Sequence, residues 1–242
     1  MKSEIVNNIL TETKQIYDRI APDFAITRNK WWTAFGDFGK HAKDGDNILD
    51  IGCGNGRMAT LFENLNVNYL GIDNSSELIK IASNRFKEKN NVKFEVGEAS
   101  DLNLRENKFD IVLMMAVLHH IPTSELRLKI LKDINALMKK DGMLIMSNWN
   151  LWQLGYWKKY WPRLLDYNFK IKKGVWSLKD GFIPWRPIGN KNQRYVHSFT
   201  LRELKRLLSQ SGFKVETASY ENMGKPAGFL NGFNSMVIAR KK

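Results

Sequence analysis

The residues best placed to do chemistry are three glycines at alternate positions, Gly52, Gly54 and Gly56, with an acid downstream at Asp73. The glycines follow a short apolar segment that predicts a strand over 47–52. Glycine lets a backbone turn sharply and approach a ligand where any Cβ would collide. Asp73 ends the second predicted strand, where a carboxylate can accept two hydrogen bonds from a ribose diol. The combination indicates a nucleoside site on an open α/β sheet.

The spacing of the glycines indicates which kind of nucleoside binds there. Dinucleotide sites read G-x-G-x-x-G, whereas this chain reads G-x-G-x-G directly after Asp50. This variant resembles the first motif of class I S-adenosylmethionine (AdoMet) methyltransferases, with a nicotinamide dinucleotide site as the alternative. In that family the turn after the third strand contacts adenine, and here the turn begins at Gly97. The resemblance implies AdoMet as cofactor and a binding set of Asp50, Gly52, Cys53, Gly54, Gly56, Asp73, Asn74, Glu98, Ala99 and Met115.

Strand and helix signals alternate along the chain, which predicts a mostly parallel sheet with ligands at the C-terminal ends of the strands. Thr200 and Glu203 form a capping box that opens a late helix. Two last strands, near 214–220 and 232–240, have no helix between them and would pair as an antiparallel hairpin. We therefore expect an α/β, Rossmann-like class I methyltransferase fold with seven strands and helices on both faces. The other expected elements are strands 47–52, 68–73, 92–97, 109–117 and 142–148 and helices 57–65, 75–89 and 123–139.

Composition sets the class of protein. With 242 residues and 43% hydrophobic residues, the chain can form one methyltransferase domain, 1–242, carrying an inserted lobe at about 150–195. The single cysteine, Cys53, excludes an intrachain disulfide and a cysteine zinc site, and fits a reducing compartment. The longest apolar run, 111–118, is too short to span a membrane, and the charged, helix-periodic N-terminus is no signal peptide. We expect a cytoplasmic protein without integral membrane association.

The segment 150–196 is unusually basic and rich in tryptophan. It holds ten Lys or Arg against two Asp, a net +8 within a chain of net charge +13. Six of the eight tryptophans lie between Trp149 and Trp185. Cations interleaved with aromatic rings suit the phosphates and unstacked bases of RNA. Two other interpretations stay open: the tryptophans pack a small lobe onto the sheet, or the segment lies on a membrane surface.

Residues and motifs that the sequence lacks limit which chemical groups can accept the methyl group. Methylation at C5 of uracil needs a cysteine nucleophile, but Cys53 lies inside the glycine loop. The Asn/Asp-Pro-Pro-aromatic motif of exocyclic-amine methyltransferases is replaced after the fourth strand by the segment 115–120. Carboxylate, hydroxyl and small-molecule acceptors remain. His119 and His120 end this segment, and adjacent histidines on a strand point apart, so we expect one of them in the pocket wall and no metal site.

Four further segments resemble a narrower group, the tRNA wobble-uridine carboxymethyl methyltransferases. They are 17–28, 116–120, 182–185 and 193–204. That family esterifies the carboxylate of 5-carboxymethyluridine at the first anticodon position, so the resemblance implies tRNA as the partner. Eukaryotic members act with a small zinc-binding activator subunit, which makes such a subunit a candidate partner here. The tryptophan-rich stretch is fuller than expected for that family.

A carboxylate acceptor needs a cation or hydrogen-bond donors on one oxygen while the other oxygen faces the methyl group. Tyr195 and His197 could instead be same-face residues of an extended segment that packs beside the last helix. Two rival functions remain: a small-molecule or lipid O-methyltransferase with the tryptophan lobe as an apolar lid, and a catalytically silent RNA-binding protein. The candidates for the acceptor pocket are Arg28, His120, Arg194, Tyr195 and His197.

Overall fold

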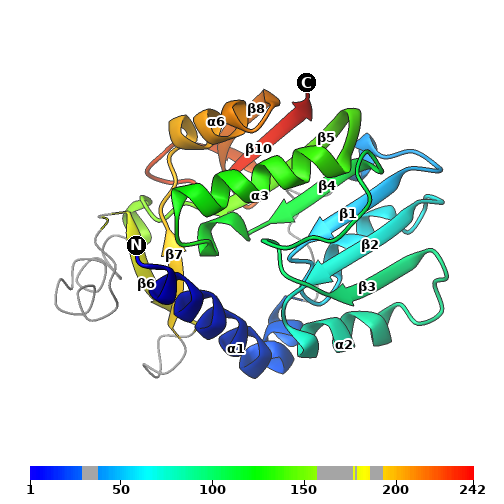
Figure 1. The fold of residues 1–242 in the computed structure, drawn as a ribbon, viewed down its shortest axis with the longest axis horizontal. Coiled ribbons are helices and arrows are strands. Elements are labelled where there is room, and N and C mark those ends of the chain that lie inside the picture. The colour runs from blue at the N-terminus through cyan, green and yellow to red at the C-terminus, as the bar shows by residue number, and fades with distance from the viewer. Residues whose placement is uncertain (29–37, 157–176, 178, 186–192) are drawn as a thin grey trace.

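The computed structural model describes residues 1–28, 38–156, 177, 179–185 and 193–242. Its centre is an eight-stranded sheet in the order β3-β2-β1-β4-β5-β10-β8-β9 (Figure 1). Neighbours from β3 to β5 pair in parallel, whereas β10 pairs antiparallel with both β5 and β8. The strands are β1 (Asn47–Ile51), β2 (Asn68–Asp73), β3 (Val92–Val96), β4 (Phe109–Met115), β5 (Met138–Trp149), β8 (Phe213–Asn222), β9 (Lys225–Ala227) and β10 (Asn234–Lys241).

This topology confirms the expected fold class. The strand order reverses between β1 and β4, and a crevice for a ligand opens at the carboxyl ends of the strands at such a point. The expected C-terminal pair is present as β8 and β10. The count of seven strands was one too low, because the chain turns back after β8 to add the three-residue β9 at the edge.

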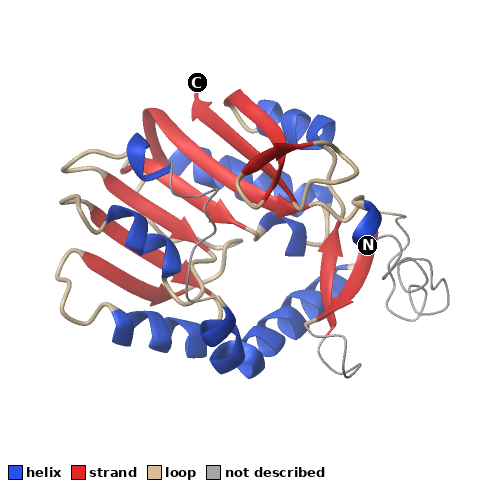
Figure 2. Ribbon diagram, turned by 180° about the vertical axis from the view of Figure 1, so that it is seen from behind, coloured by secondary structure: helices blue, strands red, loops and turns tan. Residues whose placement is uncertain are grey.

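Helices cover both faces of the sheet (Figure 2). Alternate residues of β1 belong to different cores: Leu49 packs in the cluster that includes α3 and α6, and Ile48 packs in the cluster on the other face. The expected helix at 57–65 is a 3-10 helix, η2, which follows Gly56 in the left-handed region at φ 72°. The helices are α1 (Ser3–Thr27), η2 (Arg57–Phe62), α2 (Ser76–Arg85), η3 (Leu118–His120), α3 (Ser124–Leu137) and α6 (Leu201–Gln210).

Side-chain caps explain where α2 and α6 begin. Ser75 accepts a hydrogen bond from the backbone N–H of Leu78 at 3.2 Å, which starts α2. Thr200 accepts from the N–H of Glu203 at 3.3 Å, as half of the expected capping box. The other half is absent, because the Glu203 carboxylate contacts His197 and Lys179 instead.

Helix α1 lies across the carboxyl ends of the strands, between α2 and a two-stranded hairpin, β6 (Asp180–Pro184) and β7 (Gln193–His197) (Figure 1). Ile9 packs against Phe182 and Tyr195 of the hairpin. No helix among the described residues is long and apolar enough to cross a membrane. Most of the expected substrate lobe, including Trp157 and Trp161, lies outside the described residues, so that assignment stays a prediction.

Candidate active site

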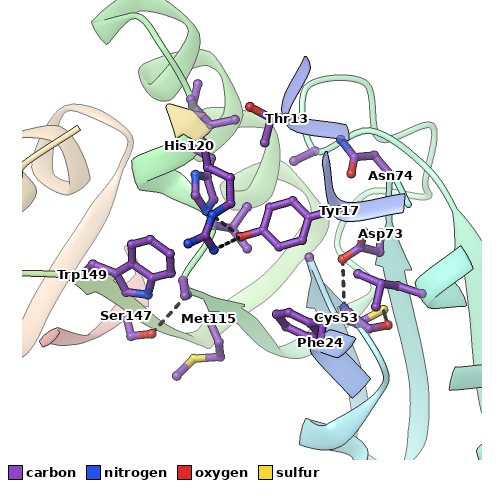
Figure 3. A pocket seen from close by; sticks show the side chains of 18 of the residues that line it. Thr13, Tyr17, Phe24, Cys53, Asp73, Asn74, Met115, His120, Ser147 and Trp149 are labelled. Atoms are coloured by element: carbon purple, nitrogen blue, oxygen red, sulfur yellow. Dashed lines mark hydrogen bonds between the residues drawn. The ribbon is translucent and has the colours of Figure 1, made fainter. Parts of the chain in front are cut away.

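A cavity of about 410 Å³ lies at the carboxyl ends of β1, β2 and β4, beneath α1 (Figure 3). One side is formed by the glycine loop and the ends of β2, β3 and β4. The other side is formed by α1, η3, the end of β5 and the β6–β7 hairpin. Its lining includes Leu10, Thr13, Tyr17, Phe24, Arg28, Gly52, Cys53, Gly54, Arg57, Asp73, Asn74, Gly97, Glu98, Ala99, Ser100, Met115, Ala116, Val117, His120, Trp149, Gln153, Tyr156, Trp185, Arg194 and Phe233.

The three glycines of the loop share a backbone conformation but differ in what they contact. All lie in the left-handed region, at φ 70° for Gly52, 56° for Gly54 and 72° for Gly56, which favours glycine. A Cβ on Gly52 would come within 2.2 Å of a methyl carbon of Val117. Gly52 and Gly54 line the cavity, but Gly56 does not, contrary to its expected place in the cofactor set. A Cβ there would lie 2.7 Å from the Phe94 ring, so Gly56 lets the loop pack closely on β3.

Asp73 lies at the tip of β2 and faces the loop. Its Oδ2 accepts a hydrogen bond from the N–H of Gly54 at 2.9 Å, and its Oδ1 accepts from the N–H of Ser75 at 2.9 Å. Each carboxylate oxygen has a second acceptor position, so both can still receive a ligand hydroxyl. Burial raises the pKa of Asp73 to about 6, although the two backbone hydrogen bonds oppose that shift.

Asp50 occupies a different place from the one expected. It is fully buried at the end of β1, below the loop, and does not line the cavity. Its Oδ2 accepts a hydrogen bond from the hydroxyl of Tyr69. Burial raises the pKa of Asp50 to about 7, opposed by this hydrogen bond and reinforced by the nearby charge of Asp73. The carboxyl therefore joins β1 to Tyr69 of β2 directly before the loop begins.

The ends of β3 and β4 complete this side of the cavity. Asn74 donates a hydrogen bond to Glu98 at 3.4 Å, which joins the tips of two neighbouring strands. Ala99 and Met115 also line the cavity. Next to Met115, Ala116 adopts φ 61°, and its N–H donates to the carbonyl and hydroxyl of Ser147 at 3.0 and 3.1 Å. Such strain costs on the order of 1–3 kcal/mol and is typical of functional sites; no sequence signal marked it.

Arg194 is the central cation of the opposite side. Its side chain is 4% exposed, and its guanidinium carbon lies 4.7 Å from the ring centroid of Trp149, 5.1 Å from that of Trp185 and 5.8 Å from that of Tyr17. Its hydrogen bonds are long, at 3.4 Å to the Tyr17 hydroxyl and 3.5 Å to the Pro184 carbonyl. The Nε has no hydrogen-bond partner among the residues that the structure describes. No acidic side chain in the described part of the chain forms a hydrogen bond or ion pair with this buried guanidinium.

A directional chain of hydrogen bonds extends from Arg194 to Tyr17 and from Tyr17 to His120; Figure 3 labels the last two. The Tyr17 hydroxyl lies 2.9 Å from Nε2 of His120, whose Nδ1 lies 2.7 Å from the carbonyl of Tyr195. Because a carbonyl can only accept, Nδ1 carries the proton and Nε2 accepts from Tyr17. Burial, with repulsion from Arg194, lowers the pKa of His120 to about 3. The imidazole is therefore neutral and orients Tyr17.

The two histidines do not point apart as expected, because they lie on the 3-10 turn η3 instead of on a strand. Their ring centroids are 4.3 Å apart, and His119 lies behind His120, fully buried and 4.6 Å from the centroid of Trp149. Only His120 lines the cavity. The described residues contain no cluster of three or more His, Cys, Asp or Glu side chains that could hold a metal ion.

Tyr195 and His197 do not reach the cavity, so the structure corrects their expected place in the acceptor pocket. Side chains alternate along β7, and these two point away from the face that carries Arg194. The Tyr195 hydroxyl donates to Asp180 at 2.7 Å. The two ring nitrogens of His197 lie 2.6 Å from Asp180 and 2.9 Å from Glu203. They belong to a buried polar network that joins β6, β7 and α6.

Two more arginines make the cavity cationic. Arg28 is half-buried at the end of α1, with its guanidinium carbon 5.3 Å from the centroid of Trp185. Burial and repulsion from Arg194 lower its pKa, against a weaker attraction to Asp23. Burial and repulsion from Arg28 lower the pKa of Arg57 to about 10. An anion bound among these cations would relieve their repulsion.

Sequence reasoning did not list Tyr17, Trp149, Trp185 or Arg57 as site residues. Tyr17 and Trp185 lie in segments that carry the family resemblance, and this was an available signal. Trp149 sits directly after the fifth predicted strand, where a parallel sheet delivers side chains to its ligand edge. Arg57 follows the glycine loop, but nothing in its spacing distinguishes it from a surface arginine.

A family model for a methyltransferase domain matches residues 26–218. The chain belongs to the class I AdoMet-dependent methyltransferases. A structure from Methanosarcina mazei, described as an AdoMet-dependent methyltransferase, superposes with a TM-score of 0.69 and 25% identity, over 84% of this chain and 96% of that one. AdoMet is thus the cofactor, and the glycine loop beside Asp73 fits a nucleoside with a ribose diol.

Curated relatives share the family. A Schizosaccharomyces pombe tRNA (carboxymethyluridine(34)-5-O)-methyltransferase is 30% identical over 216 residues, which cover 86% of this methyltransferase and 90% of the relative. An Arabidopsis thaliana protein of the same name is 35% identical over 135 residues. That alignment covers 56% of this chain and 32% of the Arabidopsis protein, so the match spans about a third of that relative's length.

Replacing Asp50 with Asn tests whether the pKa of this buried carboxyl is raised. A group whose folded pKa is raised takes up more protons in the folded state, so its contribution to stability falls as pH rises from about 4 to about 7. The free energy of unfolding of the wild type should therefore fall relative to that of Asp50→Asn across this window, by roughly 3–5 kcal/mol, and the difference should stay constant above it. Denaturant titrations at several pH values measure this. Parallel curves for the two proteins would contradict the raised pKa.

Proposed function

We propose that this methyltransferase esterifies a carboxylate on a tRNA, namely that of 5-carboxymethyluridine at the wobble position. The observation that carries the proposal is Arg194, a buried guanidinium enclosed by three aromatic rings and aimed into the cavity. A buried cation is costly to keep when no acid pairs with it, and none of the described acidic side chains pairs with Arg194. A bound carboxylate would provide the missing countercharge through charge-assisted hydrogen bonds.

The cofactor side of the cavity would hold AdoMet through the residues that face it. Gly52 and Gly54 would give the backbone access to the amino-acid and ribose portions, and Cys53 lies between them. Asp73 would accept from the ribose hydroxyls, with Asn74 beside it. Glu98 and Ala99 would border the adenine, and Met115 would border the sulfonium region. AdoMet supplies an electrophilic methyl group bonded to a positively charged sulfur.

The acceptor side would position the nucleophile. Arg194 and Arg28 would hold one carboxylate oxygen and turn the other toward the methyl group. The new bond joins that oxygen to the methyl carbon as the sulfur–carbon bond breaks, and no proton has to move. A general base is therefore unnecessary, which agrees with a His120 whose pKa is about 3. The role of His120 is to orient Tyr17, whose hydroxyl contacts Arg194.

The S. pombe relative, aligned over most of both chains, supports the tRNA substrate. The need for a small activator subunit stays a prediction from the family resemblance. The same holds for tRNA contacts by the tryptophan-rich lobe, which lies largely outside the described residues. The rival O-methyltransferase activity on a small molecule or lipid would use the same cofactor side, so the identity of the acceptor decides between the two.

The stability of the transferred methyl group to alkali identifies the acceptor. The methyltransferase is incubated with methyl-labelled AdoMet and with tRNA from a strain that lacks wobble carboxymethyl esters. Label should enter the tRNA and be released by mild alkali, because a methyl ester hydrolyses where an ether or an N-methyl group does not. Alkali-stable label in RNA, or label that enters only small molecules or lipids, would reject the proposal. Treating the tRNA beforehand with a reagent that blocks carboxylates should abolish incorporation.

Asp73→Ala should weaken AdoMet binding by about 1.5–3 kcal/mol, because two hydrogen bonds to the ribose would be lost. Isothermal titration calorimetry measures the affinity. Protonation removes acceptor capacity, so wild-type affinity should also fall as pH drops through about 6, whereas Asp73→Asn should show a flatter profile. Unchanged affinity in Asp73→Ala would remove Asp73 from the cofactor site.

Arg194→Met should lower kcat/KM for the tRNA by roughly 10- to 100-fold, because a charge-assisted contact to the acceptor is lost. AdoMet affinity should not change, since Arg194 lies on the opposite side of the cavity. Thermal stability should stay equal or rise, because an uncompensated buried charge is removed. Arg194→Lys is the matched control and should retain part of the activity. Full activity in Arg194→Met would exclude this residue from the acceptor pocket.

A further inference from the structure

Four large apolar side chains stand exposed near the loop that connects β9 to β10. Leu154 is 54% exposed, Phe229 40%, Leu230 51% and Phe233 42%. We call these four residues the apolar rim. Single exposed apolar residues are ordinary, but several gathered on one feature indicate a contact surface. Nothing in the cofactor or acceptor chemistry described above uses them.

The backbone beneath the apolar rim is held firmly. The N–H of Leu154 donates to the carbonyl of Leu230 at 2.9 Å. The Asn150 side chain donates to the carbonyls of Phe229 and Gly232 at 2.7 and 2.9 Å. The N–H of Phe233 donates to the carbonyl of Glu221 at 2.7 Å. A loop bonded in this way presents its side chains in a fixed arrangement, which lowers the entropy lost on binding.

Aromatic rings support the rim from below. The ring of Phe229 lies against Trp152, with centroids 6.0 Å apart and planes at 29°. Tyr220 meets the same ring edge-on, at 5.6 Å and 62°. With 40% of its surface open, Phe229 is held by two neighbours and still offers surface to a partner.

The apolar rim is continuous with the acceptor side of the cavity. Phe233 both lines the cavity and is exposed at the surface, and Gln153 and Tyr156 line the cavity next to Leu154 in the chain. A substrate group seated near Arg194 would leave the rest of its molecule close to this edge. The rim is therefore placed to contact the part of the substrate that adjoins the acceptor group.

The charge of this segment favours a polyanion. Close to the rim in the chain, Lys225 of β9 is exposed, and residues 222–239 contain no Asp or Glu. The preceding acid, Glu221, is buried and accepts hydrogen bonds from Asn234 and from the N–H of Gly224. Exposed aromatic rings without acidic neighbours match single-stranded nucleic acid, whose bases stack on aromatic side chains while its phosphates require positive surroundings.

We propose that the apolar rim stacks on an unpaired base next to the methylated nucleotide of an RNA loop, with Phe229 and Phe233 as the stacking rings. This inference rests on the proposed function, because it assumes that the acceptor is part of an RNA. It goes beyond that function in assigning recognition of the flanking nucleotide to a defined surface. Binding of the RNA would then require that the base next to the methylated nucleotide is unpaired.

The experiment measures binding of an RNA hairpin that carries 5-carboxymethyluridine in its loop, by fluorescence anisotropy. Phe229→Leu keeps an apolar side chain but removes the ring, and should weaken binding on the order of tenfold. Phe229→Tyr restores a ring and should restore affinity. Val96→Thr, an exposed apolar residue of β3 at the opposite edge of the sheet, is the matched control and should bind as the wild type does.

A second set of hairpins lacks the base on one side or the other of the acceptor. If Phe229 stacks on one of these bases, removing that base should weaken wild-type binding but add little to the loss caused by Phe229→Leu, because the contact is already gone. The same cycle with Phe233→Leu tests the second ring. Additive losses in both cycles would overturn the proposal.

Other outcomes separate the inference from the proposed function. Normal esterification of tRNA with rim variants that behave as the wild type would overturn the rim assignment alone. Ring-dependent hairpin binding without formation of an alkali-labile ester would support the rim and reject the function. Rim-dependent binding to phosphatidylglycerol vesicles, with no ring-dependent RNA binding, would overturn the rim assignment in favour of a lipid contact.

Discussion

The carboxylate of Asp73 is the contact on which the cofactor side depends. It accepts one hydrogen bond from Gly54 in the glycine loop and another from Ser75 at the start of α2, and so joins the ends of β1 and β2 to the first turn of a helix. The same Ser75 caps α2 and donates its hydroxyl to Asp18 of α1 at 2.7 Å. One acid therefore sets the loop geometry and, through Ser75, the position of the helix that covers the cavity.

Helix α1 ties the two sides of the cavity together. Asp18 contacts the cofactor side through Ser75, while its neighbour Tyr17 contacts His120 and Arg194 on the acceptor side. Farther along, Asp23 accepts a hydrogen bond from the indole of Trp185, and Phe24 packs against the same ring. A helix outside the central sheet thus supplies part of the cavity wall and fixes the aromatic surroundings of the buried arginine.

The mostly parallel sheet and its C-terminal antiparallel pair were predictable because alternating apolar segments and caps such as Ser75 and Thr200 are local signals. The glycine loop and Asp73 were predictable as a pair because both sit at strand ends, which a parallel sheet brings to one edge. The role of Gly56 and the place of Asp50 were not, since both depend on packing against Phe94 and Tyr69 of other strands.

The acceptor side was harder to predict. The segment 193–197 was recognised, but which of its faces meets the cavity depends on how β7 pairs with β6. That register places Arg194 inside and sends Tyr195 and His197 to Asp180. The 3-10 turn at His120 has too few residues to show a period. Its partner Tyr17 lies 103 residues away, so no local pattern could connect them.

The long separations within the site bear on how the protein folds. Arg194 contacts Tyr17 across 177 residues, and Trp185 contacts Asp23 across 162. Contacts that close such long loops carry a large entropic cost and form late. During synthesis, α1 emerges before the sheet and can meet α2 early, through Asp18 and Ser75. Its contacts with β6 and β7 form only after the parallel strands have been made. Until then α1 lacks its contacts with the hairpin. A chain shortened before β7 would keep the five parallel strands but would lack β8, β9, β10 and the acceptor pocket.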